Sequence, residues 1–374
     1  MKILLIGEIY SDNLGDGIIY ENMKFALEGI VPEVDIIPYD LSLRTDFNIK
    51  DETITKSLLK SALKKRFPKV FDNIKLKKEL IQYRQGLSEY FKNENYDVAI
   101  FCGGQILSKH FIASIYALIN KLELSNTPVY FYGVGIGDIH TEKQKRLLKK
   151  ILTSKIVKQI TVRDGLEKLN AIYPDIKITK CYDVALLSSK TYDINRIENS
   201  CIIGLGIMDV KGKEEEVLRF WEQLLFKLKN VENYTFELFT NGNIDDTRLA
   251  NYIYEKYLKN YSNFRLAKRP TSTQELVQTI SKFNRIISFR LHSHIISRAL
   301  SIPSIALIWD NKVEEFFDFI GVKGNCFNFE LDESIDEIMH KIDGIEFPFQ
   351  NGKDLEYLQS EIISSINSII KDHI

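Results

Sequence analysis

Apolar and polar positions alternate along this chain with two different periods. Short runs rich in Val and Ile are separated by amphipathic stretches, a pattern typical of parallel strands and helices that take turns. Five such runs occur in the first half of the chain, at residues 2–7, 34–39, 96–102, 128–135 and 158–164. Five more occur in the second half, at residues 200–207, 234–240, 264–267, 285–289 and 303–309. The pattern predicts an α/β protein with two open sheets.

The domain organisation follows from where this alternation restarts. A chain of 374 residues is too long for one comfortable core, and residues 186–200 are polar enough to form an irregular linker. We therefore expect two Rossmann-like domains over 1–190 and 191–350, facing a central cleft. Residues 351–374 should form a helix that packs back on the first domain. Because ligands bind beyond the carboxyl ends of parallel strands, the residues just after each strand are the candidates for a site.

Composition and charge exclude several classes of protein. Fifty basic and 51 acidic side chains give a net charge of -1, so no basic footprint for nucleic acid is present. The first apolar run ends at Glu8 and is typical of a strand, not of a signal peptide, and no apolar run reaches the roughly 18 residues that span a bilayer. The four cysteines lack metal-type spacing. We expect a reduced, cytoplasmic protein.

The first candidate site follows the first strand. Asn13, Gly15 and Asp16 form a predicted tight turn before a helix that should begin at about Ile18. One interpretation is structural, with Asp16 capping the helix. The other places the Asp16 carboxylate at the mouth of the cleft, beside a helix N-terminus that attracts anions.

Two more candidates follow later strands of the first half. Gly103 and Gly104 end the third strand and would let backbone approach a ligand, although ordinary turn geometry explains them equally well. Arg163 and Asp164 end the fifth strand. They could form a surface pair in which Asp164 caps a helix. Alternatively, Arg163 faces the cleft as a fork-shaped clamp for carboxylate or phosphate.

The richest stretch is ISFRLHSHIISRAL, residues 287–300. Arg290, His292 and His294 could share one face if the strand continued, and a His-x-His metal pair lacks a third ligand nearby. His294 can also be a structural histidine. His292, with Arg290 beside it, is suited to proton transfer on an anionic substrate. Lys312 follows the next strand as a second cation or as a solvated lysine.

Taken together, these motifs resemble the polysaccharide pyruvyl transferases. NLGDGII, FCGGQIL, VRDGLEKL, DVAL, SFRLHSHIISRALSIPSIAL and WDNKVEEFFDFIG follow in that family's order, from residue 7 to about 322. The most specific element is Arg290–Leu291–His292 with Asp-x-Lys about twenty residues later. Gln105 stands where a third glycine is common, Val184 where Asp-Pro is usual, and no serine follows the Arg-Asp motif.

The resemblance implies a glycosyltransferase-B-like fold and a defined reaction. A pyruvyl group passes from phosphoenolpyruvate to two hydroxyls of a sugar, which forms a ketal and releases phosphate. The acceptor would be a surface polysaccharide or its lipid-linked precursor, for example one on polyprenyl diphosphate. Two other functions stay open: a nucleotide-sugar glycosyltransferase of the same fold, and a carbohydrate-binding protein without turnover.

The expected roles combine the residues with this chemistry. His292 is the general acid, Asp16 the base or acceptor-orienting group, and Arg163 and Lys312 complete the catalytic set with no metal and no cofactor. Substrate contacts are expected from Arg290, Leu291, Asn13, Gly15, Gly103, Gly104 and His294. The lysine-rich segment 57–69 is interpreted as a solvated helix, or as a basic surface for peripheral contact with the inner face of a membrane.

Overall fold

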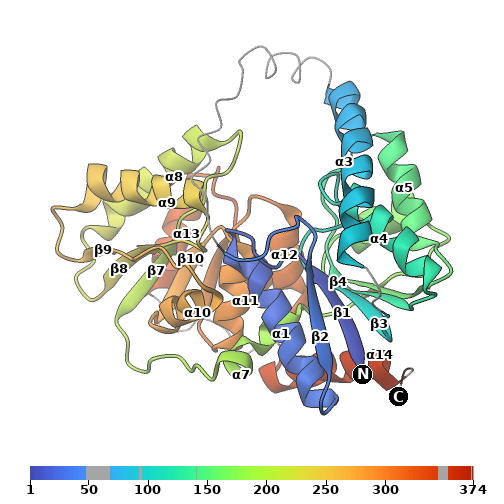
Figure 1. Cartoon of the computed structure of the whole chain (residues 1–374). Coiled ribbons are helices and arrows are strands. Elements are labelled where there is room, and N and C mark those ends of the chain that lie inside the picture. Colours follow the sequence, from blue (N-terminus) through green and yellow to red (C-terminus); the bar gives the residue numbers. More distant parts are fainter. Residues whose placement is uncertain (48–67, 92–94, 140, 344–352, 372, 374) are drawn as a thin grey trace. The chain divides into compact units, whose positions relative to one another are not determined.

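The chain forms two compact units (Figure 1). The computed structural model describes residues 1–47, 68–91, 95–139, 141–343, 353–371 and 373. Unit 1 comprises Met1–Tyr10, Met23–Tyr182 and Ser364–Ile374, and unit 2 comprises Ser11–Asn22 and Asp183–Ile363. The sequence predicted a single domain boundary at residue 190. The observed grouping differs from it, because residues 11–22 and 183–190 belong to unit 2.

Unit 1 contains a six-stranded parallel sheet with the order β2-β1-β3-β4-β5-β6. Its strands are β1 (Lys2–Gly7), β2 (Asp35–Asp40), β3 (Val98–Cys102), β4 (Val129–Val134), β5 (Val157–Val162) and β6 (Thr179–Lys180). β1, β3 and β4 are buried along almost their whole length, as expected for strands that helices cover on both faces. The helices of this unit are α3 (Pro68–Tyr90), α4 (Ile112–Leu124), α5 (Glu142–Leu152) and α6 (Leu166–Ile172).

Unit 2 contains a second six-stranded parallel sheet with the order β12-β11-β10-β7-β8-β9. Its strands are β7 (Ile202–Gly206), β8 (Thr235–Phe239), β9 (Phe264–Leu266), β10 (Arg285–Ser288), β11 (Ser304–Leu307) and β12 (Cys326–Phe327). The strand order reverses between β7 and β10, which pair with each other from Arg285↔Ile203 to Ser288↔Gly206. Ligands of open α/β sheets bind beyond the carboxyl edge at such a reversal.

Helices precede, connect and follow the strands of the second sheet. They are η1 (Val184–Leu187), α7 (Ser188–Tyr192), α8 (Glu214–Leu228), α9 (Ile244–Ile253), η2 (Tyr254–Leu258), α10 (Thr273–Ser281), α11 (Leu291–Ala299), α12 (Asn311–Phe319), η3 (Lys323–Asn325) and α13 (Glu333–Asp343). Figure 1 shows α10 and α11 beside the strands of this sheet. In the described part of the chain, two helices have residues in both units, α1 (Leu14–Ile30) and α14 (Leu355–Lys371).

The first turns of α1 group with unit 2 for a reason visible in their hydrogen bonds. The backbone N–H of Leu14 donates to the carbonyl of Asn241, 3.0 Å away, in the loop after β8. The side chain of Asn22 donates to Ser188 Oγ at 3.3 Å. Residues 14–22 are therefore anchored to the second half of the chain, although they follow the first strand.

The ten strands predicted from the hydrophobic pattern are all present, and so is the closing helix as α14. Among the described residues, the pattern missed the strands β6 and β12, which lie at sheet edges and, with two residues each, are too short to show alternation. The predicted linker is wrong in its first part, because residues 184–192 form η1 and α7 with Leu186 and Leu187 fully buried. Of the lysine-rich segment, residues 57–67 lie outside the described residues.

Within the part of the chain that the structure describes, no helix is long and apolar enough to cross a membrane.

Candidate active site

The candidate site lies at the carboxyl edge of the second sheet, where β10 ends and α11 begins. The strand ends at Ser288, and the helix starts at the buried residue Leu291. Arg290 lies between them with extended backbone angles. His292 and His294 are therefore on a helix, roughly 200° apart around its axis. The strand does not continue past Ser288, so Arg290, His292 and His294 do not share one face of a strand.

The absence of a side chain at Gly206 leaves space for Ser288, the last residue of β10. A Cβ at Gly206, on the neighbouring strand β7, would lie 2.1 Å from Ser288 Oγ. That hydroxyl oxygen accepts a hydrogen bond of 3.1 Å from the backbone N–H of Arg290. The hydroxyl therefore fixes the backbone that carries Arg290 at the point where the strand order reverses.

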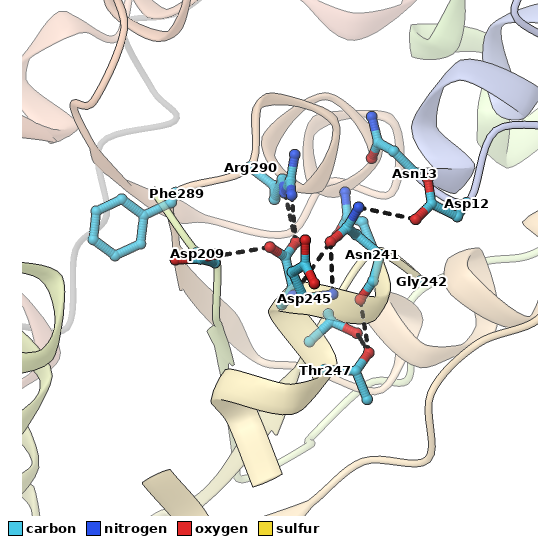
Figure 2. A network of polar contacts seen from close by, with 12 residues as sticks. Asp12, Asn13, Asp209, Asn241, Gly242, Asp245, Thr247, Phe289 and Arg290 are labelled. Carbon is cyan, nitrogen blue, oxygen red and sulfur yellow. Dashed lines mark hydrogen bonds and ion pairs between the residues drawn. The ribbon is translucent and has the colours of Figure 1, made fainter. Parts of the chain in front are cut away.

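Arg290 is held by a buried carboxylate (Figure 2). Its Nε and Nη2 both contact Asp246 Oδ2, at 2.7 and 2.6 Å. Burial raises the pKa of Asp246, and the positive charge of Arg290 opposes that rise. The other oxygen of Asp246 accepts from the backbone N–H of Asp209, after β7, at 2.9 Å. These contacts fix the guanidinium plane of Arg290, and the carboxylate of Asp246 offsets its positive charge.

His292 lies in the first turn of α11, and its side chain touches the first turn of α1. The residue is 5% exposed. A Cβ placed on Gly15 would lie 2.2 Å from His292 Nδ1 and 2.4 Å from Cγ, so only glycine fits against this ring. In the structure Gly15 makes room for the imidazole, and its expected contact with substrate stays a prediction. The sequence prediction placed Asp16 and His292 in different domains, whereas both belong to unit 2.

The residues after β8 join the first turns of α1 and α11. The side-chain oxygen of Asn241 accepts from Ser293 Oγ at 2.8 Å, in addition to the bond from Leu14 N to the Asn241 carbonyl. Asn243 donates to Asp12 Oδ2 at 3.0 Å (Figure 2). The loop therefore holds His292, next to Ser293, against the segment that contains Gly15.

Asn13 and Asp16 bond to each other at the start of α1. Asn13 Nδ2 donates to Asp16 Oδ2 at 3.0 Å, and the backbone N–H of Asp16 donates to the carbonyl of Asn13 at 3.1 Å. The helix begins at Leu14, earlier than the expected Ile18, so Asp16 is a first-turn acid and does not precede the helix. A carboxylate in the first turn is stabilised by the helix dipole.

Lys312 lies in the first turn of α12, after β11. Its backbone N–H is capped by Asp310 Oδ1 at 3.0 Å, and its Nζ is 4.3 Å from the centre of the Trp309 ring. Trp309 Nε1 donates to the carbonyl of Phe289 at 2.7 Å. Lys312 is therefore connected through Trp309 to the end of β10, the strand that precedes Arg290.

His294 does not lie at this edge. It is fully buried, its Nε2 lies 3.0 Å from the Ser288 carbonyl oxygen, and its ring packs edge-on against Phe317. Burial lowers its pKa to about 3, which keeps the ring neutral. The expected substrate contact of His294 is therefore wrong, and the residue is a structural histidine.

The glycines after β3 belong to unit 1. Gly103 and Gly104 have φ values of 51° and 65°, which favour glycine. The N–H of Gly103 donates to the Tyr132 carbonyl at 3.0 Å, and the Gly104 carbonyl accepts from Gly135 at 2.7 Å. These bonds fasten the loop to the end of β4, and a substrate contact there stays a prediction.

Arg163 and Asp164, also in unit 1, form a buried ion pair at 3.1 Å and not a surface pair. Asp164 does not cap α6, whose N-cap is Gly165 with φ 68°. A Cβ on Gly135 would lie 2.8 Å from either carboxylate oxygen of Asp164, so this carboxylate packs tightly against backbone. That Arg163 meets Arg290, His292 and Lys312 stays a prediction.

Sequence reasoning missed several residues of this network. Asn241 and Asn243 directly follow the strand run 234–240, so the rule applied to other strand ends would have found them. Asp246 carries no such signal, because its pairing with Arg290 joins residues 44 positions apart. Among the described residues, no group of three or more His, Cys, Asp or Glu side chains could hold a metal ion.

Solved structures share the fold of the whole chain. A UDP-GlcNAc 2-epimerase from Neisseria meningitidis bound to UDP-GlcNAc has a TM-score of 0.61 at 14% identity, covering 100% of this chain and 99% of that one. MnaA from S. aureus with UDP gives 0.59 at 13% identity, covering 96% and 91%. A UDP-GlcNAc 2-epimerase from Methanocaldococcus jannaschii gives 0.60 at 13% identity, covering 99% and 100%. These likenesses confirm the glycosyltransferase-B fold class.

The sequence comparisons give the family. No curated protein matched the chain. A family model described as polysaccharide pyruvyl transferase matches residues 13–311, a range that runs from Asn13 at the start of α1 to Asn311 beside Lys312 and includes Arg290 and His292. The match covers most of the 374 residues. The chain therefore belongs to the polysaccharide pyruvyl transferase family, and its general activity is pyruvyl transfer to polysaccharide.

Proposed function

We propose that this protein transfers the pyruvyl group of phosphoenolpyruvate to two hydroxyls of one sugar, in a surface polysaccharide or its lipid-linked precursor. The observation that carries the proposal is the grouping of Arg290, His292 and Lys312 after the adjacent strands β10 and β11, beside the reversal of strand order between β7 and β10. Phosphoenolpyruvate has a carboxylate and a phosphate. A fixed guanidinium, an ammonium group and two helix N-termini suit both anions.

His292 is the general acid in this proposal. It gives its proton to C3 of the enol, the C2 centre becomes oxocarbenium-like, and the first sugar hydroxyl attacks C2. The C2–O bond to phosphate then breaks, the second hydroxyl closes the ketal, and phosphate takes up one of the two hydroxyl protons. The other restores His292. Contact with Gly15 fixes the ring in one place, as proton transfer requires.

Arg290 and Lys312 bind the donor in different ways. Arg290 already pairs with Asp246, so it contributes directed N–H groups and little net charge. Lys312 contributes charge at the first turn of α12. Arg163 is likewise paired, with Asp164, and its contribution to donor binding would also be directional. The helix N-termini therefore supply part of the neutralisation that three cations were expected to give.

Asp16 is proposed as the base or orienting group for the acceptor hydroxyl. It lies one residue from Gly15, which touches His292, and its Oδ2 is held by Asn13 at 3.0 Å. The acid and the base would thus come from neighbouring first turns of α11 and α1. A lipid-linked acceptor and action at the inner face of the membrane stay predictions.

The test is a calorimetric binding screen of phosphoenolpyruvate against UDP-GlcNAc, followed by a phosphate-release assay with oligosaccharide acceptors. The proposal expects phosphoenolpyruvate to bind and its phosphate to be released only when an acceptor is present. Binding of UDP-GlcNAc without binding of phosphoenolpyruvate would instead favour a nucleotide-sugar glycosyltransferase. Binding of oligosaccharides alone, without phosphate release, would favour a carbohydrate-binding protein.

A further inference from the structure

Trp309 lies at the carboxyl edge of the second sheet, between the end of β11 at Leu307 and Lys312 in the first turn of α12. Its indole is half-buried and packs with one part against the apolar core of unit 2. The sequence has one other tryptophan, Trp221 in α8, which is fully buried. Trp309 is therefore the tryptophan at the edge where the donor is proposed to bind, and the proposed reaction gives it no role.

A hydrogen bond fixes the indole against the neighbouring strand. Nε1 of Trp309 donates to the carbonyl of Phe289 at 2.7 Å. Phe289 is fully buried and directly precedes Arg290. Since β10 and β11 are parallel neighbours, with Ser288 opposite Ala306, this bond joins the two segments that leave the sheet side by side. The indole is thus held relative to the backbone that carries Arg290.

Lys312 is held at both of its ends. Its backbone N–H donates to Asp310 Oδ1 at 3.0 Å, which caps α12. Its Nζ lies 4.3 Å from the centre of the Trp309 ring, within the range of a cation–π attraction. A lysine side chain is flexible, so without the ring its ammonium group would occupy many positions. The cap therefore fixes where the side chain starts, and the indole fixes where it ends.

An aromatic partner differs from an acidic one in its effect on charge. Arg290 pairs with the carboxylate of Asp246, which offsets the guanidinium charge. An indole has no net charge, so its contact fixes the ammonium group of Lys312 without neutralising it. The two cations are thus positioned by partners of different kinds, which suits their different tasks: directed N–H groups from Arg290 and positive charge from Lys312.

We propose that Trp309 is a positioning residue for the donor, holding the ammonium group of Lys312 where it meets an anionic group of that substrate. The inference rests on the proposed function, in which Lys312 binds phosphoenolpyruvate. It adds that Lys312 reaches its full effect only with the indole beside it. Because the same indole is bonded to the carbonyl before Arg290, it also sets the spacing between the two cations. Trp309 need not touch the donor to do this.

Steady-state kinetics of three single variants test the contact. Trp309→Leu keeps an apolar side chain but removes the ring, so the KM for phosphoenolpyruvate should rise roughly three- to tenfold with kcat nearly unchanged. Trp309→Phe keeps a ring beside the ammonium group and should restore part of the loss. Tyr261→Leu is the matched control, because the Tyr261 ring lies 4.3 Å from Lys229 Nζ, before β8 and β9 at the opposite edge of the sheet. It should have the KM of the wild type.

A double variant separates positioning from general damage. If Trp309 acts through Lys312, Trp309→Leu should cause no further loss of donor affinity in a Lys312→Ala background. Calorimetry with phosphoenolpyruvate measures the affinities, and thermal unfolding checks that each variant is folded. An equal loss in both backgrounds, or a wild-type KM in Trp309→Leu, would overturn the assignment.

Two spectroscopic signals distinguish this inference from the proposed function. Phosphoenolpyruvate should change the tryptophan fluorescence of the wild type but not that of Trp309→Phe, in which the buried Trp221 is the remaining tryptophan. Without donor, the ring current should place the NMR signal of the Lys312 side chain, identified by its absence in Lys312→Ala, at higher field than in Trp309→Leu. Identical positions of that signal would overturn the positioning role. Failure of the wild type to bind phosphoenolpyruvate would overturn the proposed function and leave the NMR result standing.

Discussion

Single glycines decide how closely the segments of the site approach. At Gly15 the missing side chain leaves space for the ring of His292, and at Gly206 it leaves space for Ser288 Oγ. Both positions lie in regular elements, where glycine costs roughly 0.5–1 kcal/mol relative to alanine. The close contact with His292 explains the glycine at position 15, and the close contact with Ser288 explains the glycine at position 206.

Gly15→Ala should therefore inactivate the protein. The added Cβ would lie 2.2 Å from His292 Nδ1, so the ring must move, and displacement of a catalytic group by about 1 Å can cost roughly 100-fold in rate. Gly29→Ala, on the same helix, meets nothing within 4 Å and should keep full activity with slightly raised stability. Phosphate release and thermal unfolding measure the two effects. Equal activity of both variants would show that the position of the His292 ring is unimportant.

The buried His294 should make stability depend on pH. Its pKa is about 3 in the folded protein and about 6.5 when unfolded, so between these values only the unfolded chain binds the proton. The stabilisation by neutral His294 is complete above pH 6.5 and falls by about 1.4 kcal/mol per pH unit below it. In His294→Leu this component of the slope should vanish. Urea unfolding of both proteins from pH 7.5 to 5 measures it, and identical slopes would contradict the assignment.

At the scale of elements, the site is formed by the N-termini of three helices and the ends of the neighbouring strands. The first turn of α11 carries His292, that of α12 carries Lys312, and that of α1 carries Gly15 and Asp16. Asn241, after β8, bonds to two of these helices. The orientation of His292 thus depends on a residue that need not touch substrate.

Asn241→Ala should lower kcat by roughly 10- to 100-fold and leave the KM for phosphoenolpyruvate nearly unchanged, because Arg290 and Lys312 stay in place. Ser293→Ala removes the other half of the same hydrogen bond, so the double variant should lose no more than the worse single variant. Asn120→Ala, a half-buried residue of α4 bonded to the Tyr116 carbonyl at 2.7 Å, is the control. Additive losses would show that Asn241 and Ser293 act separately.

The elements were largely predictable from the sequence, and their contacts were not. Hydrophobic runs predicted ten strands because buried parallel strands are apolar on both faces. Because ligands bind beyond the carboxyl ends of parallel strands, inspection of the residues after each strand selected Arg290, His292 and Lys312. It could not tell that Asp246 neutralises Arg290 or that Asp164 is buried with Arg163, because both pairings depend on tertiary packing. His294 was misplaced because the helix starts at Leu291, which turns the ring towards the core.

At the scale of the whole molecule, the balance of charge decides how the donor is neutralised. The chain as a whole is nearly neutral, with a net charge of -1, so attraction of an anion must come from local groups. In the proposed site these are Lys312, the donors of Arg290 and the helix N-termini. Arg290 is offset by Asp246, which makes the site less cationic than its residue types suggest.

Pyruvyl transfer should survive EDTA, because these groups replace the charge that a divalent metal would supply. Activity should fall as ionic strength rises, since salt screens the attraction at partly exposed cations such as Lys312. Assays with and without EDTA, and across a salt series at fixed phosphoenolpyruvate, measure both effects. Loss of activity on chelation with recovery on adding magnesium or manganese would show that a metal supplies part of the charge.

The most direct measurement of the central claim is phosphate release from phosphoenolpyruvate by the wild type and three variants, combined with calorimetric binding of that donor. His292→Ala should lose roughly 10²- to 10⁴-fold in turnover while keeping most of the donor affinity, since it removes the acid. Lys312→Ala should weaken donor binding as well, and His340→Ala, at an exposed histidine of α13, should behave like the wild type. Near-normal turnover in His292→Ala would contradict the account, because protonation at C3 would then come from another group.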